Sequence, residues 1–256
     1  MKALAPLALL LALVGFAAPT LRAAGGPMDR TWVDERTGKD NYDCSAARPC
    51  ASFARALEQT KDHGTIGCLS PGDHGAFTIT DRSVSITCAG ASAGITVKTG
   101  TAITINNASP DAHVYIEGLD LSGMASATSA IAMTGVGRLT ISRTNIHDFT
   151  GPGIDMAGGF AARAVIDNVR VLQALGGLRL KGIGGAANYA IVHDSLFESN
   201  HEYGVSVDGT SIAVLDSSVL TGNPHGLVST NGGLVVTDGN NIIRPNGVAM
   251  LTIPQE

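Results

Sequence analysis

An apolar repeat that begins near residue 112 constrains the fold more than any other feature of this chain. One position of the repeat is taken by Ile116, Ile141, Ile166, Val192, Leu215 and Thr237. A second apolar row is formed by Leu121, Ile146, Val171, Phe197, Leu220 and Ile242, and a third by Ile131, Ile154, Leu178, Val205, Leu227 and Val248. Three short strands in each repeat of 21 to 27 residues, separated by Gly and Asn, are typical of a β-solenoid.

A single repeat of this kind cannot bury its own apolar face. Side chains alternate across a strand, so equivalent inward positions stack into ladders when one turn lies on the next. Each inward Ile, Val or Leu contributes roughly 1.5–3 kcal/mol when it is buried. Three ladders over six turns supply a sufficient core, and we therefore predict one all-β parallel solenoid over residues 75–256.

Glycine and asparagine occupy the turns before the third strands. The glycines are Gly153, Gly177, Gly204, Gly226 and Gly247. There we expect sharp turns in which a positive φ is tolerated. Asn200, Asn223 and Asn246 lie in the same turns, and we expect them to stack and to satisfy backbone groups that strand pairing does not reach. Ordinary loop polarity is the alternative explanation of these asparagines.

The first 24 residues predict a secretory signal peptide. Lys2 is followed by an apolar Leu/Ala segment up to Phe16 and then by small residues, which places cleavage between residues 17 and 24. The apolar segment is shorter than the roughly 20 residues that a membrane span requires. We therefore expect a secreted or periplasmic protein with no membrane association after signal removal, and an uncleaved anchor is the alternative.

Residues 25–74 are expected to form an N-terminal cap. The segment from Ser52 to Thr60 places Phe53, Ala56 and Leu57 at helical spacing, which predicts a short amphipathic helix. Such a helix would cover the unpaired edge of the first turn, which is otherwise an aggregation hazard.

The four cysteines all lie in or near this cap and fit an oxidising compartment. We expect Cys44–Cys50 to close a short polar loop. We expect Cys68–Cys88 to join stacked positions of neighbouring turns, because these are about 4.8 Å apart and a disulfide tolerates that separation. A zinc site is the competing interpretation, although paired CxxC units are absent.

Composition limits the classes of partner. The net charge is −5 and no basic cluster occurs in the sequence, so a nucleic-acid partner is not expected. Aromatic residues make up only 4% of the chain, which disfavours a flat aromatic platform for neutral sugars. The oligomeric state cannot be inferred from the sequence.

A charged cluster is predicted on the outer side of the third strands. There Asp155 and Arg179 follow each other on successive turns, and Lys181 and Asp208 do so two residues further along. Stacked positions are about 4.8 Å apart, so these four residues could hold a uronate, or Ca²⁺ through the two carboxylates. A surface salt-bridge ladder of little energetic value is the alternative.

A second outward row is predicted beside the first strands, consisting of Glu117, Ser142, Asp167, His193, Asp216 and Asp238. This row could bind Ca²⁺ or could keep the surface soluble. A histidine between two aspartates, as His193 is here, should have a raised pKa.

Residues 112–250 resemble the right-handed parallel β-helix repeat of the pectate lyase-like superfamily. The segments 43–50, 52–57 and 68–72 resemble the capped start of its uncharacterised exported bacterial members. The resemblance implies the fold but leaves the chemistry open, because this fold hosts lyases, hydrolases, epimerases, adhesins and binding proteins. For a lyase it implies Arg179 or Lys181 as the proton-abstracting base, with Asp155 and Asp208 holding Ca²⁺. The Asp–Asp pair typical of the hydrolases is absent.

Three functions are therefore compared. The first is the binding of an envelope or extracellular polysaccharide, or of another macromolecule, along one face of the solenoid. The second is a pectate-type lyase, and the third is a structural spacer without a ligand. Degradative enzymes of this fold build a substrate groove from long insertions, whereas the turns here are all similarly short, so we favour binding. Whether the protein is an enzyme is left open.

Overall fold

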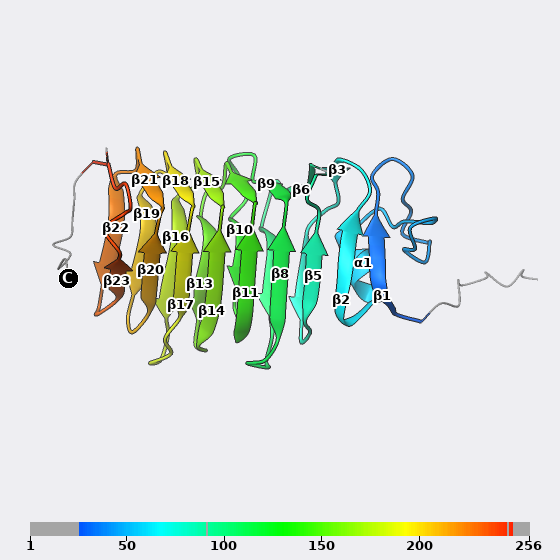
Figure 1. Cartoon of the computed structure of the whole chain (residues 1–256), viewed down its shortest axis with the longest axis horizontal. Helices are drawn as coiled ribbons and strands as arrows, with labels where there is room; N and C mark the ends of the chain where they lie inside the picture. The colour runs from blue at the N-terminus through cyan, green and yellow to red at the C-terminus, as the bar shows by residue number, and fades with distance from the viewer. Residues whose placement is uncertain (1–25, 91, 245, 248–256) are drawn as a thin grey trace, which may run out of the picture.

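The computed structural model describes residues 26–90, 92–244 and 246–247. The predicted signal peptide and Val248 of the third row lie outside these residues. The described chain coils into a parallel solenoid whose turns follow one another along a single axis (Figure 1). A complete turn contributes one strand to each of three sheets, called here the first, second and third sheets. The predicted all-β solenoid is therefore confirmed.

The three sheets are built from strands that pair in parallel. The first sheet contains β1 (Met28–Val33), β2 (Thr60–Cys68), β5 (Val84–Thr87), β8 (His113–Glu117), β11 (Gly137–Ser142), β14 (Ala162–Asp167), β17 (Tyr189–His193), β20 (Ile212–Asp216) and β23 (Leu234–Thr237). The second contains β3 (Gly72–Asp73), β6 (Ala93–Thr96), β9 (Leu119–Ser122), β12 (Asn145–His147), β15 (Arg170–Leu172), β18 (Leu196–Glu198) and β21 (Val219–Thr221). The third contains β4 (Phe77–Thr80), β7 (Thr101–Asn106), β10 (Ser129–Met133), β13 (Pro152–Gly158), β16 (Gly176–Gly182), β19 (Tyr203–Asp208) and β22 (His225–Thr230).

The predicted ladders have the observed register over most of the solenoid. In the first sheet Ile116 pairs with Ile141 and Ile141 with Ile166, and all three side chains are fully buried. The second and third rows pair in the same way. The last position of the second row was wrong, because Ile242 pairs with Val219 and its side chain is 58% exposed, while Ile243 packs against the core.

The glycines before the third strands are needed for space. A Cβ on Gly177 would lie 2.5 Å from Cδ1 of Phe197, and one on Gly153 would lie 2.4 Å from Cγ1 of Val171. Neither glycine has a positive φ, so the expected reason for their presence was wrong. The second-row side chains fill the volume above these glycines, and any Cβ there would displace them.

The asparagine ladder is confirmed. Oδ1 of Asn223 accepts hydrogen bonds from both the backbone N and Nδ2 of Asn200, each at 3.0 Å. Asn246 repeats both contacts to Asn223 at 3.1 Å. Asn200 and Asn223 are each 1% exposed, so their amides satisfy turn groups that water does not reach.

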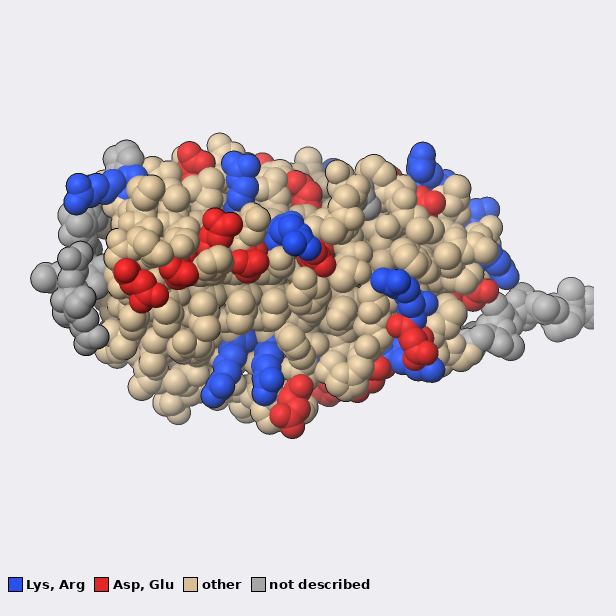
Figure 2. Space-filling view, in the orientation of Figure 1, with Lys and Arg blue, Asp and Glu red and all other residues tan. Residues whose placement is uncertain are grey.

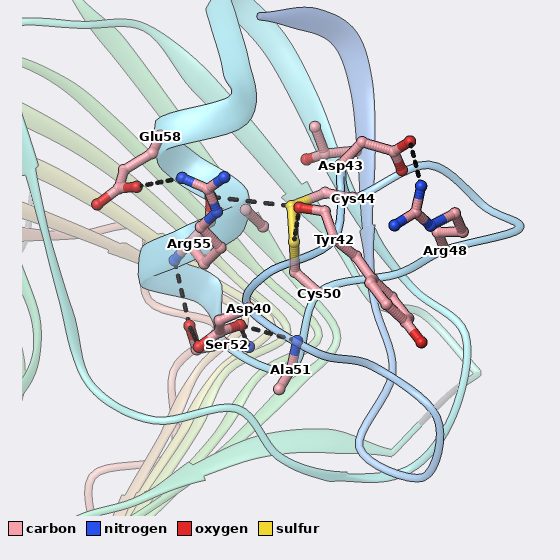
Figure 3. The surroundings of a disulfide bond; sticks show 12 residues. Asp40, Tyr42, Asp43, Cys44, Arg48, Cys50, Ala51, Ser52, Arg55 and Glu58 are labelled. Carbon is pink, nitrogen blue, oxygen red and sulfur yellow. Dashed lines mark hydrogen bonds and ion pairs between the residues drawn. A yellow bond between two sulfur atoms is a disulfide. The ribbon is translucent and has the colours of Figure 1, made fainter. Parts of the chain in front are cut away.

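The predicted capping helix is α1 (Phe53–Gln59), which begins after Ser52. The Ser52 hydroxyl accepts a hydrogen bond from the backbone N of Arg55, and Asp40 accepts hydrogen bonds from Ala51 and Ser52 (Figure 3). Phe53, Ala56 and Leu57 face the core, as their spacing predicts. The boundary expected at residue 75 is no break in the first sheet, since β1 and β2 already belong to it.

Both predicted disulfides are confirmed. Cys44–Cys50 closes the cap loop with a Cα separation of 4.7 Å, and Cys68–Cys88 joins two neighbouring turns at 4.9 Å. Thr87 pairs with Gly67, so the second bond follows directly from the register of β2 and β5. Within the described residues, no helix is long and apolar enough to cross a membrane.

Candidate functional site

The predicted charged cluster lies on the outer face of the third sheet as two separate ion pairs. Arg179 on β16 binds Asp155 on β13 through two hydrogen bonds, Nε to Oδ1 at 2.8 Å and Nη2 to Oδ2 at 2.5 Å. Lys181 on β16 approaches Asp208 on β19 at 3.8 Å. The four residues are therefore brought together, and both cations already have a carboxylate partner.

The environment of Arg179 disfavours a role as a base. The hydrogen bonds from Asp155 outweigh partial burial and raise the pKa of Arg179 above its ordinary value. A residue that removes a proton near neutral pH needs a lowered pKa instead. Beside it, burial raises the pKa of Tyr203 to about 12, so this phenol also stays protonated.

The two carboxylates of the cluster do not converge on one cation. Asp155 lies on β13 and Asp208 on β19, with β16 between them. Two strand spacings amount to roughly 9.6 Å, whereas Ca²⁺ binds its oxygen ligands at about 2.3–2.6 Å. The expectation of a shared Ca²⁺ on Asp155 and Asp208 is therefore wrong for this geometry. Within the described part of the chain, no group of three or more His, Cys, Asp or Glu side chains is arranged to hold a metal ion.

Asp208 is held by its own neighbours. Nδ2 of Asn231 donates to Oδ1 at 2.7 Å, and the Thr230 hydroxyl donates to the same oxygen at 3.1 Å. The hydrogen bond from Asn231, more than the ion pair with Lys181, lowers the pKa of Asp208.

The second predicted row lies at the carboxyl ends of the first-sheet strands. Figure 2 shows a line of acidic side chains there, beside a broad area without charged residues. His193 sits between Asp167 and Asp216, at 2.8 Å and 3.5 Å. The hydrogen bond to Asp167 raises the pKa of His193, as predicted. Glu117, by contrast, is only 8% exposed and pairs with Arg143.

An open hollow of about 420 Å³ lies where the first sheet meets the second. Its lining consists of Ser92, Gly118, Leu119, Asp120, Arg143, Thr144, Asn145, Asn168 and Arg170. Asp120, Asn145 and Arg170 stack in register on β9, β12 and β15. Nδ2 of Asn145 donates to Asp120 at 3.1 Å. Among the described residues, no carboxylate pairs with Arg170.

A histidine beside this hollow is held by two carboxylates. His147 lies 3.0 Å from Asp120 through Nε2 and 2.7 Å from Asp148 through Nδ1. Burial opposes the charged form of this ring, but the hydrogen bonds to Asp148 and Asp120 outweigh it and raise the pKa of His147. The ring is therefore a bridge that fixes Asp120 at the rim of the hollow.

The search for outward rows in the sequence covered the first and third strands only. The residues immediately before the second-row ladder, Asp120, Asn145 and Arg170, recur at steps of 25 residues. The same alternation that predicts the core would therefore have found this row. What the alternation does not contain is the approach of Arg143, which lies in the turn between sheets with a φ of 46°.

Comparison with known proteins was made for the whole chain. A search of the curated proteins and of the solved structures found no match. The family model described as the right handed beta helix region matches residues 72–248, which is more than half of the chain. Together with the parallel solenoid, this match shows that the chain belongs to the right-handed β-helix family.

Proposed function

We propose that this protein is exported and binds an acidic polysaccharide along its solenoid without cleaving it. The observation that carries the proposal is the hollow of about 420 Å³ between the first and second sheets, whose Arg170 has no carboxylate partner among the described residues. A guanidinium group matches the planar geometry of a carboxylate and binds it through two parallel hydrogen bonds.

The rest of the lining suits a sugar acid. The side-chain amides of Asn145 and Asn168 offer donors and acceptors for ring hydroxyl groups. Arg143 adds a second guanidinium, although Glu117 already neutralises it. The hollow is open, and its stacked residues come from successive turns, so a linear chain could lie along the solenoid axis.

The third-sheet cluster is the second candidate contact for the same ligand. A uronate there would have to displace Asp155 from Arg179 or Asp208 from Lys181, because each cation is already paired. We therefore assign the main contact to Arg170 and only a supporting one to Arg179 and Lys181.

Binding without turnover is supported by the protonation state of the candidate base. A lyase of this kind would need Arg179 or Lys181 to accept a proton, and the pKa of Arg179 is raised. Export is supported by the two disulfides, which form and persist in oxidising compartments.

The proposal is tested by calorimetric titration with an oligogalacturonate and with its uncharged methyl ester. We expect binding of the acid and not of the ester. Arg170→Ala should weaken binding by tenfold or more, since a hydrogen-bonded charged group contributes about 1.5–3 kcal/mol. Arg163→Ala removes an exposed cation from the first sheet and serves as the matched control with unchanged affinity.

A double variant, Arg179→Ala with Lys181→Ala, measures the share of the third-sheet cluster. A greater loss in this variant than in Arg170→Ala would move the site to the third sheet. Equal binding of acid and ester would refute a site for uronates. Release of unsaturated product, with or without Ca²⁺, would refute binding without turnover.

A further inference from the structure

A second, smaller hollow lies at a different corner of the solenoid, where the third sheet turns into the first. Its volume is about 190 Å³. It is lined by Thr80, Asp81, Asn106, Asn107, Ala108, Gly135, Val136 and Phe160. None of these residues belongs to the hollow that contains Arg170. The lining comes from successive turns, since Thr80 on β4 pairs with Asn106 on β7.

The feature that distinguishes this hollow is an unsatisfied amide. Asn107 is 2% exposed, and its Nδ2 has no hydrogen-bond partner among the described residues. The other end of the side chain is engaged, because Oδ1 accepts a hydrogen bond from the backbone N of Arg82 at 3.1 Å. The amide therefore cannot turn over without losing that contact, and its two N–H groups remain available.

Other buried asparagines of the solenoid do not share this feature. Nδ2 of Asn188 donates to two backbone carbonyls, those of Met156 at 2.9 Å and Lys181 at 3.1 Å. Nδ2 of Asn223 donates to the carbonyl of Phe197 at 3.0 Å. Buried donors in proteins are nearly always paired, so the exception at Asn107 indicates an acceptor supplied from outside the chain.

The surroundings of Asn107 define the chemistry of that acceptor. Asp81 is the one ionisable residue of the eight that line the hollow, so an anionic ligand would be repelled. One oxygen of Asp81 accepts from the backbone N of Ala108 at 2.8 Å, and the other is left to accept from a ligand. Ala108, Val136 and Phe160 make the remaining wall apolar.

Phe160 adds an exposed aromatic surface to this wall. Its side chain is 59% exposed and follows β13 in the loop that leads to β14. A large apolar side chain that remains exposed beside a lined hollow is a common mark of a binding site. Its ring offers a face to the C–H groups of a sugar.

We propose that this hollow binds the acetamido group of an N-acetylated sugar. The carbonyl oxygen of the group accepts a hydrogen bond from Nδ2 of Asn107, and its N–H donates to Asp81. The methyl group packs against Ala108 and Val136, and the sugar ring lies against Phe160. A carboxylate is excluded by Asp81, and a simple hydroxyl would leave the apolar wall without contact.

The site is tested on the full chain, labelled with ¹⁵N, by following the side-chain amide of Asn107 in a heteronuclear correlation spectrum. The signal is assigned with an Asn107→Asp variant, which keeps the acceptor for Arg82. The probe is the methyl glycoside of N-acetylglucosamine, and methyl glucoside is the matched probe without the acetamido group. We expect a saturable shift with the first probe only, with a Kd of about 1 mM.

Three controls decide the interpretation. The side-chain amide of Asn188 should not move, because both its contacts lie inside the protein. Phe160→Ala should weaken binding by tenfold or more, and Phe160→Tyr should retain it. Since Phe160 is exposed, both variants should fold normally. Arg170→Ala should leave the titration unchanged, so this site can fail or succeed independently of the acidic polysaccharide.

The following results would overturn the proposal. The absence of a saturable shift at Asn107 would mean that a water molecule or no ligand satisfies the amide. Equal shifts with both glycosides would show that the acetamido group is not recognised. A shift with N-acetylalanine methylamide but not with the sugar would assign the hollow to a peptide. Unchanged binding in Phe160→Ala would remove the ring from the site.

Discussion

The asparagine ladder gives the sharpest test of how this solenoid is held together. Asn223 is its central residue and is 1% exposed. Asn223→Ala removes the acceptor of the Asn200 backbone N and a donor to the Phe197 carbonyl, both at 3.0 Å. Nδ2 of Asn200 keeps a partner in the carbonyl of Val171. The variant therefore strands the turn groups of one rung rather than of the whole ladder.

The expected magnitude follows from those two groups. A buried polar group that loses its partner costs about 1–3 kcal/mol. Two such groups give a loss of about 2–5 kcal/mol in the free energy of unfolding, reduced if water enters the space left by the side chain. Asn240→Ala is the matched control, because its side chain is exposed and its loss should cost less than about 1 kcal/mol.

Urea denaturation followed by circular dichroism measures both variants. We expect the midpoint of Asn223→Ala to fall while the slope of the transition stays the same, which indicates lost stability without a change of folded structure. Equal losses in Asn223→Ala and Asn240→Ala would refute the view that the buried ladder stabilises the turns. A changed slope would mean that part of the solenoid unfolds separately, as repeat arrays can.

Two further predictions concern packing and pH. Gly177→Ala places a Cβ 2.5 Å from the ring of Phe197 and should cost about 1–3 kcal/mol by thermal or urea unfolding, whereas Gly159→Ala, whose Cβ meets nothing closer than 3.9 Å, should be nearly neutral. The raised pKa of His147 means that its aspartate contacts stabilise the fold fully below about pH 6.5 and lose that effect as the pH rises through the folded-state pKa. His147→Gln should therefore lower the unfolding midpoint more at about pH 5.5 than at about pH 8.5, and an equal loss at both values would contradict the ion-pair explanation.

The sequence by itself determines the solenoid and its core. Inward side chains repeat with period two inside each strand and with the turn length between strands, so positions such as Ile116, Ile141 and Ile166 are bound to stack. The Cys68–Cys88 bond and the asparagine ladder follow from the same arithmetic, because both join equivalent positions of neighbouring turns.

The prediction failed where the stacking arithmetic stops. At the last turn the second sheet is reduced to an isolated bridge at Ile242, and the register shifts by one residue so that Ile243 faces inward. With no further turn to pair against, local packing decides which of two adjacent isoleucines is buried. The reason for the turn glycines was missed similarly, because their steric limit comes from side chains on another sheet.

The candidate sites depend on distances that only the tertiary structure fixes. The sequence places Asp155 beside Arg179 and Lys181 beside Asp208, but it does not say that the first pair forms two hydrogen bonds while the second stays at 3.8 Å. The sequence is equally silent on the partners of Arg170 and Asn107. Side-chain pairing changes over shifts of about one ångström, far below the strand spacing of about 4.8 Å that a repeat encodes. The fold of this protein is therefore written in its period, and its chemistry in the offsets between neighbouring side chains.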